Sequence, residues 1–528
     1  METNRPPVWL LAAALLACLG YFAAEASLLS GGFGFPLDDS WIHLQFARNL
    51  AHGHGLSYNP GELVTGSTAP LWTALLSLLF LLPGSVILWT KLLGVLFHLA
   101  GVDATWRLAR ELGLSRGLSS LAAGLTLATS WLVWSALSGM EVPLFVLLSL
   151  WGLLLHLRER SDPGRPPLAL PLFAVASLAR PEGLLLLVLA VLDRCLVFDR
   201  EGGEVGGDLR WRRPPVRPLL LGAALAACAL LGPLLFYGWA GESVLPTTYA
   251  AKGAGGIRHL PDLRYVYNVL GILFQAQPFM TLAAGAGVVA LMARLGTRRD
   301  RGLLPALWLL ALPLAYATLA PTPTRLLGNF GRYYFPLFPV LAVLGVLGLA
   351  PAAEALGRRL RAGRLEIPAG LLLTLLLVAP TVAKLVQGAP FYARNVANVE
   401  DSDVRIARWL AERLPADAVL AVNDIGAIKF LLPNRVIDLA SIATPEIGAE
   451  IRQSQAEGLS WSQGMLAALA RRKPDYIVIF PNWIPAVAGN PSYRPVYRLA
   501  IPDNITMGGN EIVVYATPWT RYGLRPVP

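Results

Sequence analysis

The chain has 528 residues, of which 55% are hydrophobic and only 15% are charged, and its mean hydropathy is +0.53. This is more apolar surface than a soluble protein can bury, so a soluble multidomain enzyme is excluded. The net charge of +10 does not indicate nucleic-acid binding, because the arginines lie in short connections between apolar segments and alternate with connections that carry few basic residues. The composition therefore predicts a polytopic α-helical membrane protein without a nucleic-acid partner.

Apolar segments that are long enough, or nearly long enough, to cross a membrane recur as far as residue 387. Placing Arg5 and each arginine cluster in the cytoplasm predicts eleven transmembrane helices and a cytoplasmic N-terminus. The predicted spans are 8–30, 86–108, 118–137, 143–157, 167–180, 182–197, 217–238, 278–295, 302–320, 335–351 and 367–387. Residues 70–82 are also apolar, but a span there would move the next arginines outside, so this segment is expected to lie along or re-enter the outer face.

The composition changes near residue 390, where short β-like runs begin to alternate with helical periodicity. Strands are predicted at 419–422, 435–439, 476–480 and 512–516, and a helix at 461–472. Two domains are therefore expected, a transmembrane catalytic domain at 1–389 with a first outer loop at 31–85, and an extracytoplasmic α/β domain at 390–528. The second domain is predicted to position the acceptor, with Asp424 as its best candidate contact or merely a turn residue.

Two adjacent carboxylates, Asp38 and Asp39, follow the first predicted span. Carboxylates at a membrane boundary are costly to desolvate, so they indicate a functional site. Both are predicted to be catalytic, with Asp38 the principal residue. The alternative is that one of them caps the helix that begins near Ser40.

Three histidines, His43, His52 and His54, lie close to these aspartates in the sequence. Imidazoles are common metal ligands, so a divalent metal is the one cofactor that this loop suggests. The spacing of the three is not diagnostic, and ordinary polar contacts within the loop are the alternative.

Other polar and aromatic residues fall on the same predicted outer side, within apolar surroundings. Cations there suit a lipid phosphate and tyrosines suit a sugar ring, whereas interfacial anchoring is the alternative. The predicted substrate-binding residues are Glu141, Arg180, Glu182, Tyr249, Lys252, Arg332 and Tyr333.

Several motifs together resemble the GT-C superfamily of membrane glycosyltransferases, and within it the mycobacterial terminal arabinofuranosyltransferase group and its bacterial relatives. The matching segments are LDDSWI at 37–42, ARNLAHGHGLSYNPGE at 47–62, GST at 66–68, PLW at 70–72, GME at 139–141, RPEG at 180–183, LPTT at 245–248 and GRY at 331–333. The resemblance implies a polyprenyl-phosphate sugar donor. It also implies that an acid of the first outer loop, Asp38 or Asp39, is the base or a metal-linked group.

By the same resemblance, Arg180, Lys252 and Arg332 would face the lipid phosphate, and Glu141 would shape the sugar pocket. The implied function is transfer of a hexosyl or pentosyl group to a cell-envelope glycan, lipid or protein on the outer face of the bacterial plasma membrane. The alternative is a transporter or flippase of lipid-linked saccharides. A transporter would be expected to show paired repeats and matching broken helices, and neither is evident in the sequence.

Overall fold

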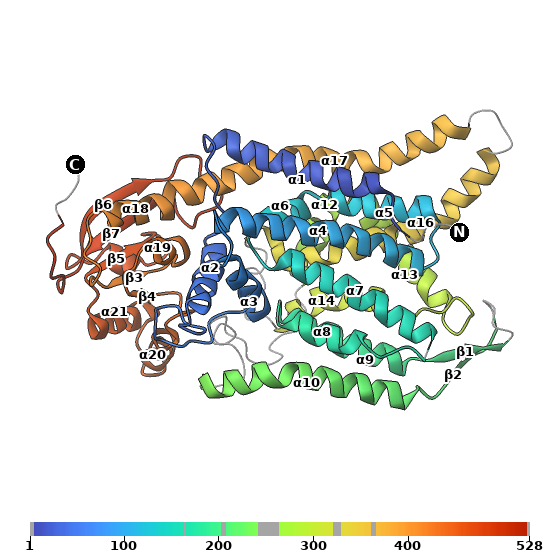
Figure 1. Ribbon diagram of the computed structural model, residues 1–528, viewed down its shortest axis with the longest axis horizontal. Coiled ribbons are helices and arrows are strands. Elements are labelled where there is room, and N and C mark those ends of the chain that lie inside the picture. The colour runs from blue at the N-terminus through green and yellow to red at the C-terminus, as the bar shows by residue number, and fades with distance from the viewer. Residues whose placement is uncertain are drawn as a thin grey trace.

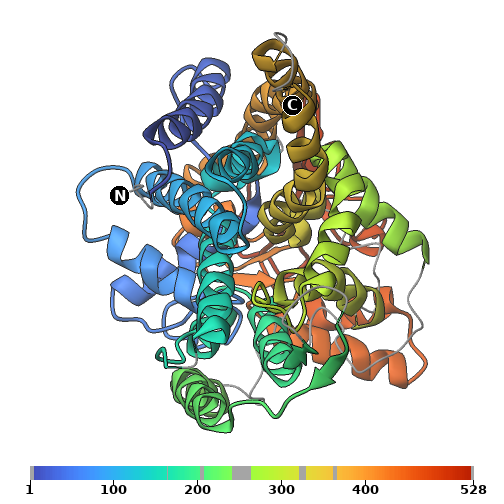
Figure 2. The ribbon, with the colours of Figure 1, turned by 90° about the vertical axis from the view of Figure 1, so that its right-hand side faces the viewer.

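The structure, a computed structural model, describes residues 5–162, 164–201, 207–240, 263–319, 329–360 and 366–524. Long helices form a bundle at one end of the molecule, and a mixed sheet with its own helices forms the other end (Figure 1). Viewed from the end opposite the sheet, the helices are grouped around one another and not in a single layer (Figure 2).

The bundle and the first outer loop contain the helices that precede the sheet. They are α1 (Val8–Leu28), α2 (Asp38–Ala51), α3 (Pro70–Leu79), α4 (Val86–Glu111), α5 (Arg116–Ala128), α6 (Ser130–Leu137), α7 (Val142–Ser161), α8 (Ala169–Ser177), α9 (Glu182–Cys195), α10 (Val216–Ala240), α12 (Leu263–Ala276), α13 (Pro278–Ala293), α14 (Leu304–Leu319), the 3-10 segment η2 (Asn329–Leu337), α16 (Phe338–Leu360) and α17 (Glu366–Val399).

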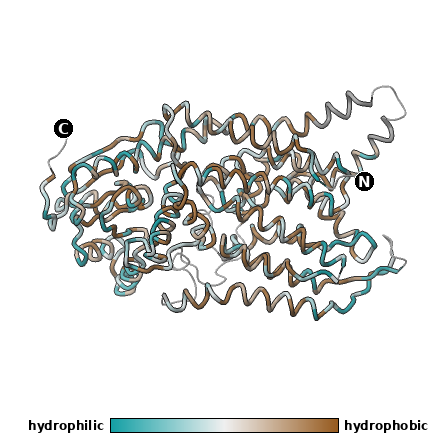
Figure 3. Tube along the Cα trace, viewed as in Figure 1, coloured by the Kyte–Doolittle hydropathy of each residue, from teal (hydrophilic) through white to brown (hydrophobic). Residues whose placement is uncertain are grey.

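Within the described residues, six helices are long and apolar enough to cross a membrane, or up to eight if the bent pairs α5–α6 and α12–α13 are each one span. Hydrophobic residues follow the bundle helices, and hydrophilic residues gather toward both ends of the molecule (Figure 3). The chain is thus a mostly helical integral membrane protein. The predicted count of eleven spans is not confirmed, in part because α8 and α9 have only 9 and 14 residues, fewer than the ~20 that a perpendicular span needs.

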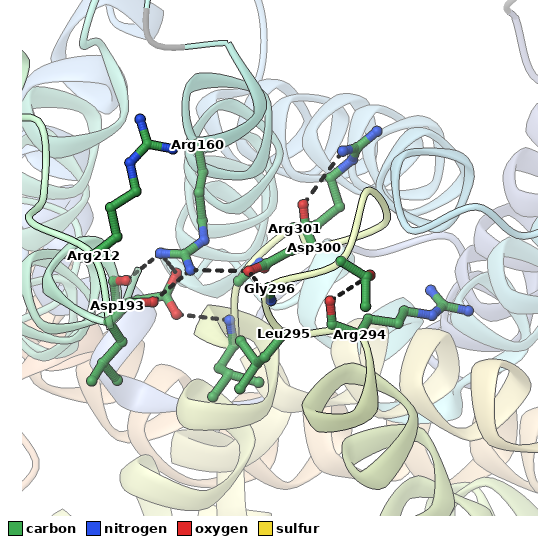
Figure 4. Close-up of polar contacts among 12 residues, drawn as sticks. Arg160, Asp193, Arg212, Arg294, Leu295, Gly296, Asp300 and Arg301 are labelled. Carbon is green, nitrogen blue, oxygen red and sulfur yellow. Dashed lines mark hydrogen bonds and ion pairs between the residues drawn. The ribbon is translucent and has the colours of Figure 1, made fainter. Parts of the chain in front are cut away.

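The arginine-rich end of the bundle, opposite the sheet, is held by buried ion pairs. Asp193 of α9 accepts a hydrogen bond from the backbone N–H of Leu303 at 2.7 Å and pairs with His156 of α7, also at 2.7 Å. Arg160 reaches both Asp193 and Asp300 (Figure 4). A short hairpin of β1 (Phe198–Arg200) and β2 (Leu209–Trp211) lies at this end as well (Figure 1). Because the buried charges are paired, their desolvation is compensated and the helix ends are fixed.

The sheet domain has five strands in the order β4-β3-β5-β7-β6. Strand β3 (Leu420–Val422) is parallel to β4 (Val436–Asp438) and β5 (Tyr476–Ile479), whereas β7 (Glu511–Ala516) is antiparallel to β5 and β6 (Arg494–Ala500). The helical elements of the domain are η3 (Glu400–Val404), a π-helical turn, α18 (Arg405–Ala411), α19 (Gly426–Leu431), α20 (Pro445–Ala456), α21 (Trp461–Arg472) and α22 (Pro485–Ala488).

The two faces of this sheet are covered differently. Side chains of α20 and α21, such as Ile447 and Leu469, pack on one face. The other face is covered by α18 and α19 and also by the first outer loop, which contributes Phe46, Tyr58 and Val64 to the same core. Helix α17 runs without interruption through residue 390, the predicted domain boundary, to Val399. The loop and the sheet domain therefore share one hydrophobic core.

Candidate active site

The two adjacent aspartates stand at the start of α2 and face different partners. Successive residues of a helix point about 100° apart, so neighbouring side chains diverge. Asp38 faces the N-terminus of α19 in the sheet domain, whereas Asp39 faces Arg332 of η2. One acid thus contacts the sheet domain and the other contacts the helix bundle.

Both carboxylate oxygens of Asp38 are engaged by backbone amides. The N–H of Gly426 donates to one oxygen at 2.6 Å, and the N–H of Ala427 donates to the other at 2.7 Å. Burial raises the pKa of Asp38 to about 7, although these two hydrogen bonds act in the opposite direction. The Asp38 carboxylate thus caps the N-terminus of α19, and not the helix near Ser40 that the sequence offered as the alternative.

Asp39 forms an ion pair with the guanidinium of Arg332, and its own side chain is 39% exposed. The Arg332 side chain is only 7% exposed, and its Nη1 is buried without a hydrogen-bond partner among the described residues. The backbone turns sharply just before this arginine, since Phe330 and Gly331 have φ values of 62° and 68°. The pair therefore consists of a solvent-accessible carboxylate and a buried guanidinium whose Nη1 has no hydrogen-bond partner among the described residues.

A second chain of charges lies next to this pair. Glu141 accepts a hydrogen bond from Arg180 at 2.5 Å and lies 3.3 Å from His43. Arg180 also donates to Glu182, which accepts a hydrogen bond from the Tyr316 hydroxyl at 2.5 Å. Burial alone would raise the pKa of Glu141, but the charge of Arg180 and the hydrogen bond with His43 outweigh it, so this pKa lies well below its usual range.

The ring of Tyr333 connects the two charge groups. The guanidinium of Arg180 lies 5.1 Å from its centroid, and that of Arg332 lies 5.8 Å from it. Both distances are within the range of cation–π attraction. The structure thus brings together Asp39, Glu141, Arg180, Arg332 and Tyr333, and Glu182 joins them through Arg180.

The three histidines of the first loop occupy different surroundings. His43 is buried against Glu141, whereas His52 and His54 are exposed, and His52 contacts the carbonyl of Arg48 at 2.7 Å. Across the described ranges, no group of three or more His, Cys, Asp or Glu side chains is arranged to hold a metal ion. A metal bound by these histidines stays a prediction that the geometry does not favour.

Two predicted substrate contacts, Tyr249 and Lys252, lie outside the described residues. Asp424 lies within the described residues, shortly after β3, and its side chain is half-buried. Burial and the nearby charges of Asp38 and Asp39 raise its pKa well above the ordinary value. The isolated candidate of the sheet domain is therefore close to the first-loop acids. The role of Tyr316 was not predicted, because an aromatic residue in an apolar helix carries no polar signal of its own.

The structure is similar to two crystal structures of ArnT from Cupriavidus metallidurans. For the apo state the TM-score is 0.59, with 14% sequence identity over 98% of this chain and 99% of that chain. For the state bound to undecaprenyl phosphate the TM-score is 0.58, with the same identity and coverage. At this identity the likeness shows the fold alone, so the chain has the same overall fold as ArnT.

Comparisons of sequence add little to this. A family model described as "Domain of unknown function (DUF8728)" matches residues 394–517, which is most of the sheet domain. A search of curated proteins gives no match. The resemblance to the mycobacterial arabinofuranosyltransferases stays a prediction.

Proposed function

We propose that this protein is a glycosyltransferase that moves a sugar from a polyprenyl-phosphate donor to an acceptor hydroxyl at the membrane surface. The ion pair of Asp39 and Arg332 carries the proposal, because it places an accessible carboxylate beside a buried cation whose Nη1 has no hydrogen-bond partner in the part of the chain that the structure describes. The ArnT fold supports it, since one of the similar structures holds undecaprenyl phosphate.

The reaction needs one base and one anion site. Asp39 accepts the proton of the acceptor hydroxyl, and the oxygen attacks the anomeric carbon of the sugar. The bond from that carbon to the phosphate oxygen breaks, and the phosphate leaves with the electron pair. Arg332 stabilises the charge that develops on the leaving phosphate. Lys252, which lies outside the described residues, is proposed as a second cation for the same phosphate.

This assignment places Asp39 ahead of Asp38, the reverse of the order predicted from the sequence. Both oxygens of Asp38 already accept backbone hydrogen bonds, and protonation would weaken these bonds because a neutral acid is a poorer acceptor than a carboxylate. Asp39 pairs with the guanidinium of Arg332, and its side chain is 39% exposed to solvent. Glu141, Arg180, Glu182 and Tyr333 are proposed to shape the pocket around the donor.

The finer identity of the reaction follows the sequence resemblance. The sugar is proposed to be a hexose or pentose, with arabinofuranose the first to test, and the acceptor a cell-envelope glycan, lipid or protein. The site is proposed to face outward from the bacterial plasma membrane, with the sheet domain extracytoplasmic and the N-terminus cytoplasmic.

The first test is transfer of labelled sugar by purified protein, using a panel of polyprenyl-phosphate hexoses and pentoses and an acceptor fraction from cell envelopes. The Asp39→Asn variant keeps the shape of the side chain but removes the base, so the rate should fall roughly 100- to 10,000-fold. Arg332→Gln should weaken the same step, because the phosphate loses its cation.

The matched control is Asp401→Asn, which neutralises a partly exposed aspartate paired with Arg405 in the sheet domain. It should retain the wild-type rate. An unchanged rate in Asp39→Asn would remove Asp39 from the mechanism. Wild-type protein that transfers no sugar, but moves labelled lipid-linked saccharide across vesicles, would favour the flippase.

A further inference from the structure

The N-terminus of α19 makes an unusually close approach to the first outer loop. A Cβ on Gly426 would lie 2.1 Å from the backbone oxygen of Asp38 and 2.7 Å from its Oδ1. Contacts this short are impossible for a side chain, so only glycine allows the amides of residues 426 and 427 to reach the Asp38 carboxylate.

Other loop side chains hold the same segment of the sheet domain through its backbone. The Tyr58 hydroxyl donates to the carbonyl of Ile425 at 2.8 Å, and Arg48 donates to the carbonyl of Phe430 at 2.8 Å. Asn59 exchanges two hydrogen bonds with the backbone of Val436. The loop is therefore fixed to α19 and β4 at several points, and the bonds to Asp38 are the ones nearest to Asp39.

The position of Asp39 depends on these bonds, because it is the next residue along the chain. A small rotation of the first turn of α2 would move the Asp39 carboxylate away from Arg332, which belongs to the helix bundle. The bundle fixes the cation, whereas the sheet domain fixes the start of the helix that carries the acid.

We propose that Gly426 and Ala427 are positioning residues for the transfer reaction, because they hold Asp38 and thereby set Asp39 against Arg332. The inference rests on the proposed function, in which Asp39 is the base. It gives the sheet domain a part in building the catalytic site, in addition to the acceptor contact expected from Asp424.

The test compares kinetic constants of the full-length protein. Asp38→Asn keeps the side-chain shape but presents an NH2 group to one of the two amides, so kcat should fall roughly 10- to 100-fold through misplacement of Asp39. The donor KM should stay within about twofold, since the cation site is untouched. Gly426→Ala should act in the same direction if the variant folds; Asp38→Asn, which adds no atoms, carries the test if it does not.

A second readout separates positioning from proton transfer. Because the proposed base, Asp39, is retained in Asp38→Asn, the loss of kcat at acidic pH, the acidic limb of the kcat–pH profile, should persist in this variant. The charged and titratable groups that face Asp39 are Arg332 of η2, Asp38 of its own helix and Asp424 of the sheet domain. The control for a general loosening of the contact between the first loop and the sheet domain is Tyr58→Phe. This variant removes the hydrogen bond to Ile425 and should leave kcat nearly unchanged.

Three results would overturn the proposal. A wild-type kcat in Asp38→Asn, with Asp39→Asn inactive, would show that the hydrogen bonds from Gly426 and Ala427 to Asp38 do not position Asp39. Loss of the acidic limb in Asp38→Asn would make Asp38 the base itself. An equal fall of kcat in Tyr58→Phe would mean that any loosening of the domain contact has the same effect. Failure of the proposed function is distinct, because it requires that Asp39→Asn be fully active.

Discussion

Arg180 carries a buried positive charge that is already balanced on both sides. Glu141 and Glu182 are its two partners, and all three side chains are nearly inaccessible to solvent. Removing one member of such a group leaves an uncompensated buried charge, which is why these residues hold one another in place. A donor phosphate would have to compete with two directly bonded carboxylates at Arg180, whereas among the described residues Arg332 is directly paired with Asp39 and keeps a buried Nη1 without a hydrogen-bond partner. The predicted phosphate contact of Arg180 is therefore less favoured than that of Arg332.

The pKa of Asp38 predicts how pH affects stability. In the unfolded chain this carboxyl has an ordinary pKa of 3.8, and burial raises it to about 7 in the folded protein. Between these two values the folded state holds a proton that the unfolded state has released, so stability should decrease as pH rises from about 4 to about 7. The thermal midpoint of the wild type should exceed that of Asp38→Asn by more at pH 5 than at pH 8.

The comparison with Asp38→Asn reports on Asp38 together with the acids that its charge affects. Burial and the charge of Asp38 raise the pKa of Asp403 and of Asp424, so both act in the same direction as Asp38. A larger advantage of the wild type at pH 8 would mean that the two amides of α19 favour the ionised carboxylate more than burial disfavours it. Differential scanning fluorimetry in detergent over this pH range is sufficient.

The sequence predicted which residues belong to the candidate site, but not which of them contact one another. Charged residues in apolar surroundings are expensive, so Asp39, Glu141, Arg180 and Arg332 stand out without a structure. Their pairing was not predictable, because Arg332 is 293 positions from Asp39. Gly426 carries no signal of its own, since a glycine after a strand is also an ordinary turn residue.

Among the elements, the helices of the bundle set the topology on which an outward-facing site depends. The arginine-rich end lies opposite the sheet domain (Figure 1), and the positive-inside rule predicts that this end is cytoplasmic. Cysteines that replace His54 and Gln453, both exposed, should react with a membrane-impermeant maleimide added to intact cells. A cysteine at Glu201, whose side chain is 70% exposed near the hairpin, should react only after permeabilisation.

The labelling requires a background without the native cysteines, Cys18, Cys195 and Cys228. Glu201 is preferred to Gly207, because a Cβ at Gly207 would lie 2.2 Å from the backbone oxygen of residue 201. Labelling of position 201 in intact cells, with positions 54 and 453 protected, would invert the orientation.

Strong patterns predicted elements well, and mixed patterns did not. Helix α21 has the predicted bounds, and the four predicted strands coincide with β3, β4, β5 and β7 to within a residue or two. Strand β6 was not predicted, because a bulge interrupts the alternation of buried and exposed residues around Val496 and Leu499. Helix α12 was also missed, because its apolar residues lie on one face and its mean hydropathy does not mark it as a span.

At the scale of the whole molecule, the shared core should make the first loop and the sheet domain unfold together. Phe46 of α2 is fully buried in that core, 5.3 Å from the ring of Tyr58. Phe46→Ala should therefore cost about 3–5 kcal/mol and lower the resistance of the sheet domain to protease, although the substitution lies in the other domain. Limited proteolysis, followed through a C-terminal tag, measures this.

The control is Leu75→Ala, also in the first loop, on α3, which packs against the bundle core and not against the sheet. It should leave cleavage of the sheet domain unchanged. A sheet domain that is equally resistant in wild type and Phe46→Ala would mean that the two parts are independently stable.

The hydrogen bonds between Asp38 and the N-terminus of α19 also have a consequence for biosynthesis. Asp38 and its amide partners are separated by 388 and 389 positions, so the intervening helices must be synthesised before the two can meet. The first loop must therefore remain incompletely folded while the later helices are inserted and the C-terminal domain folds. The proposed active site therefore forms only after α19 has been synthesised, and a chain that stops before α19 cannot leave a complete site in the membrane.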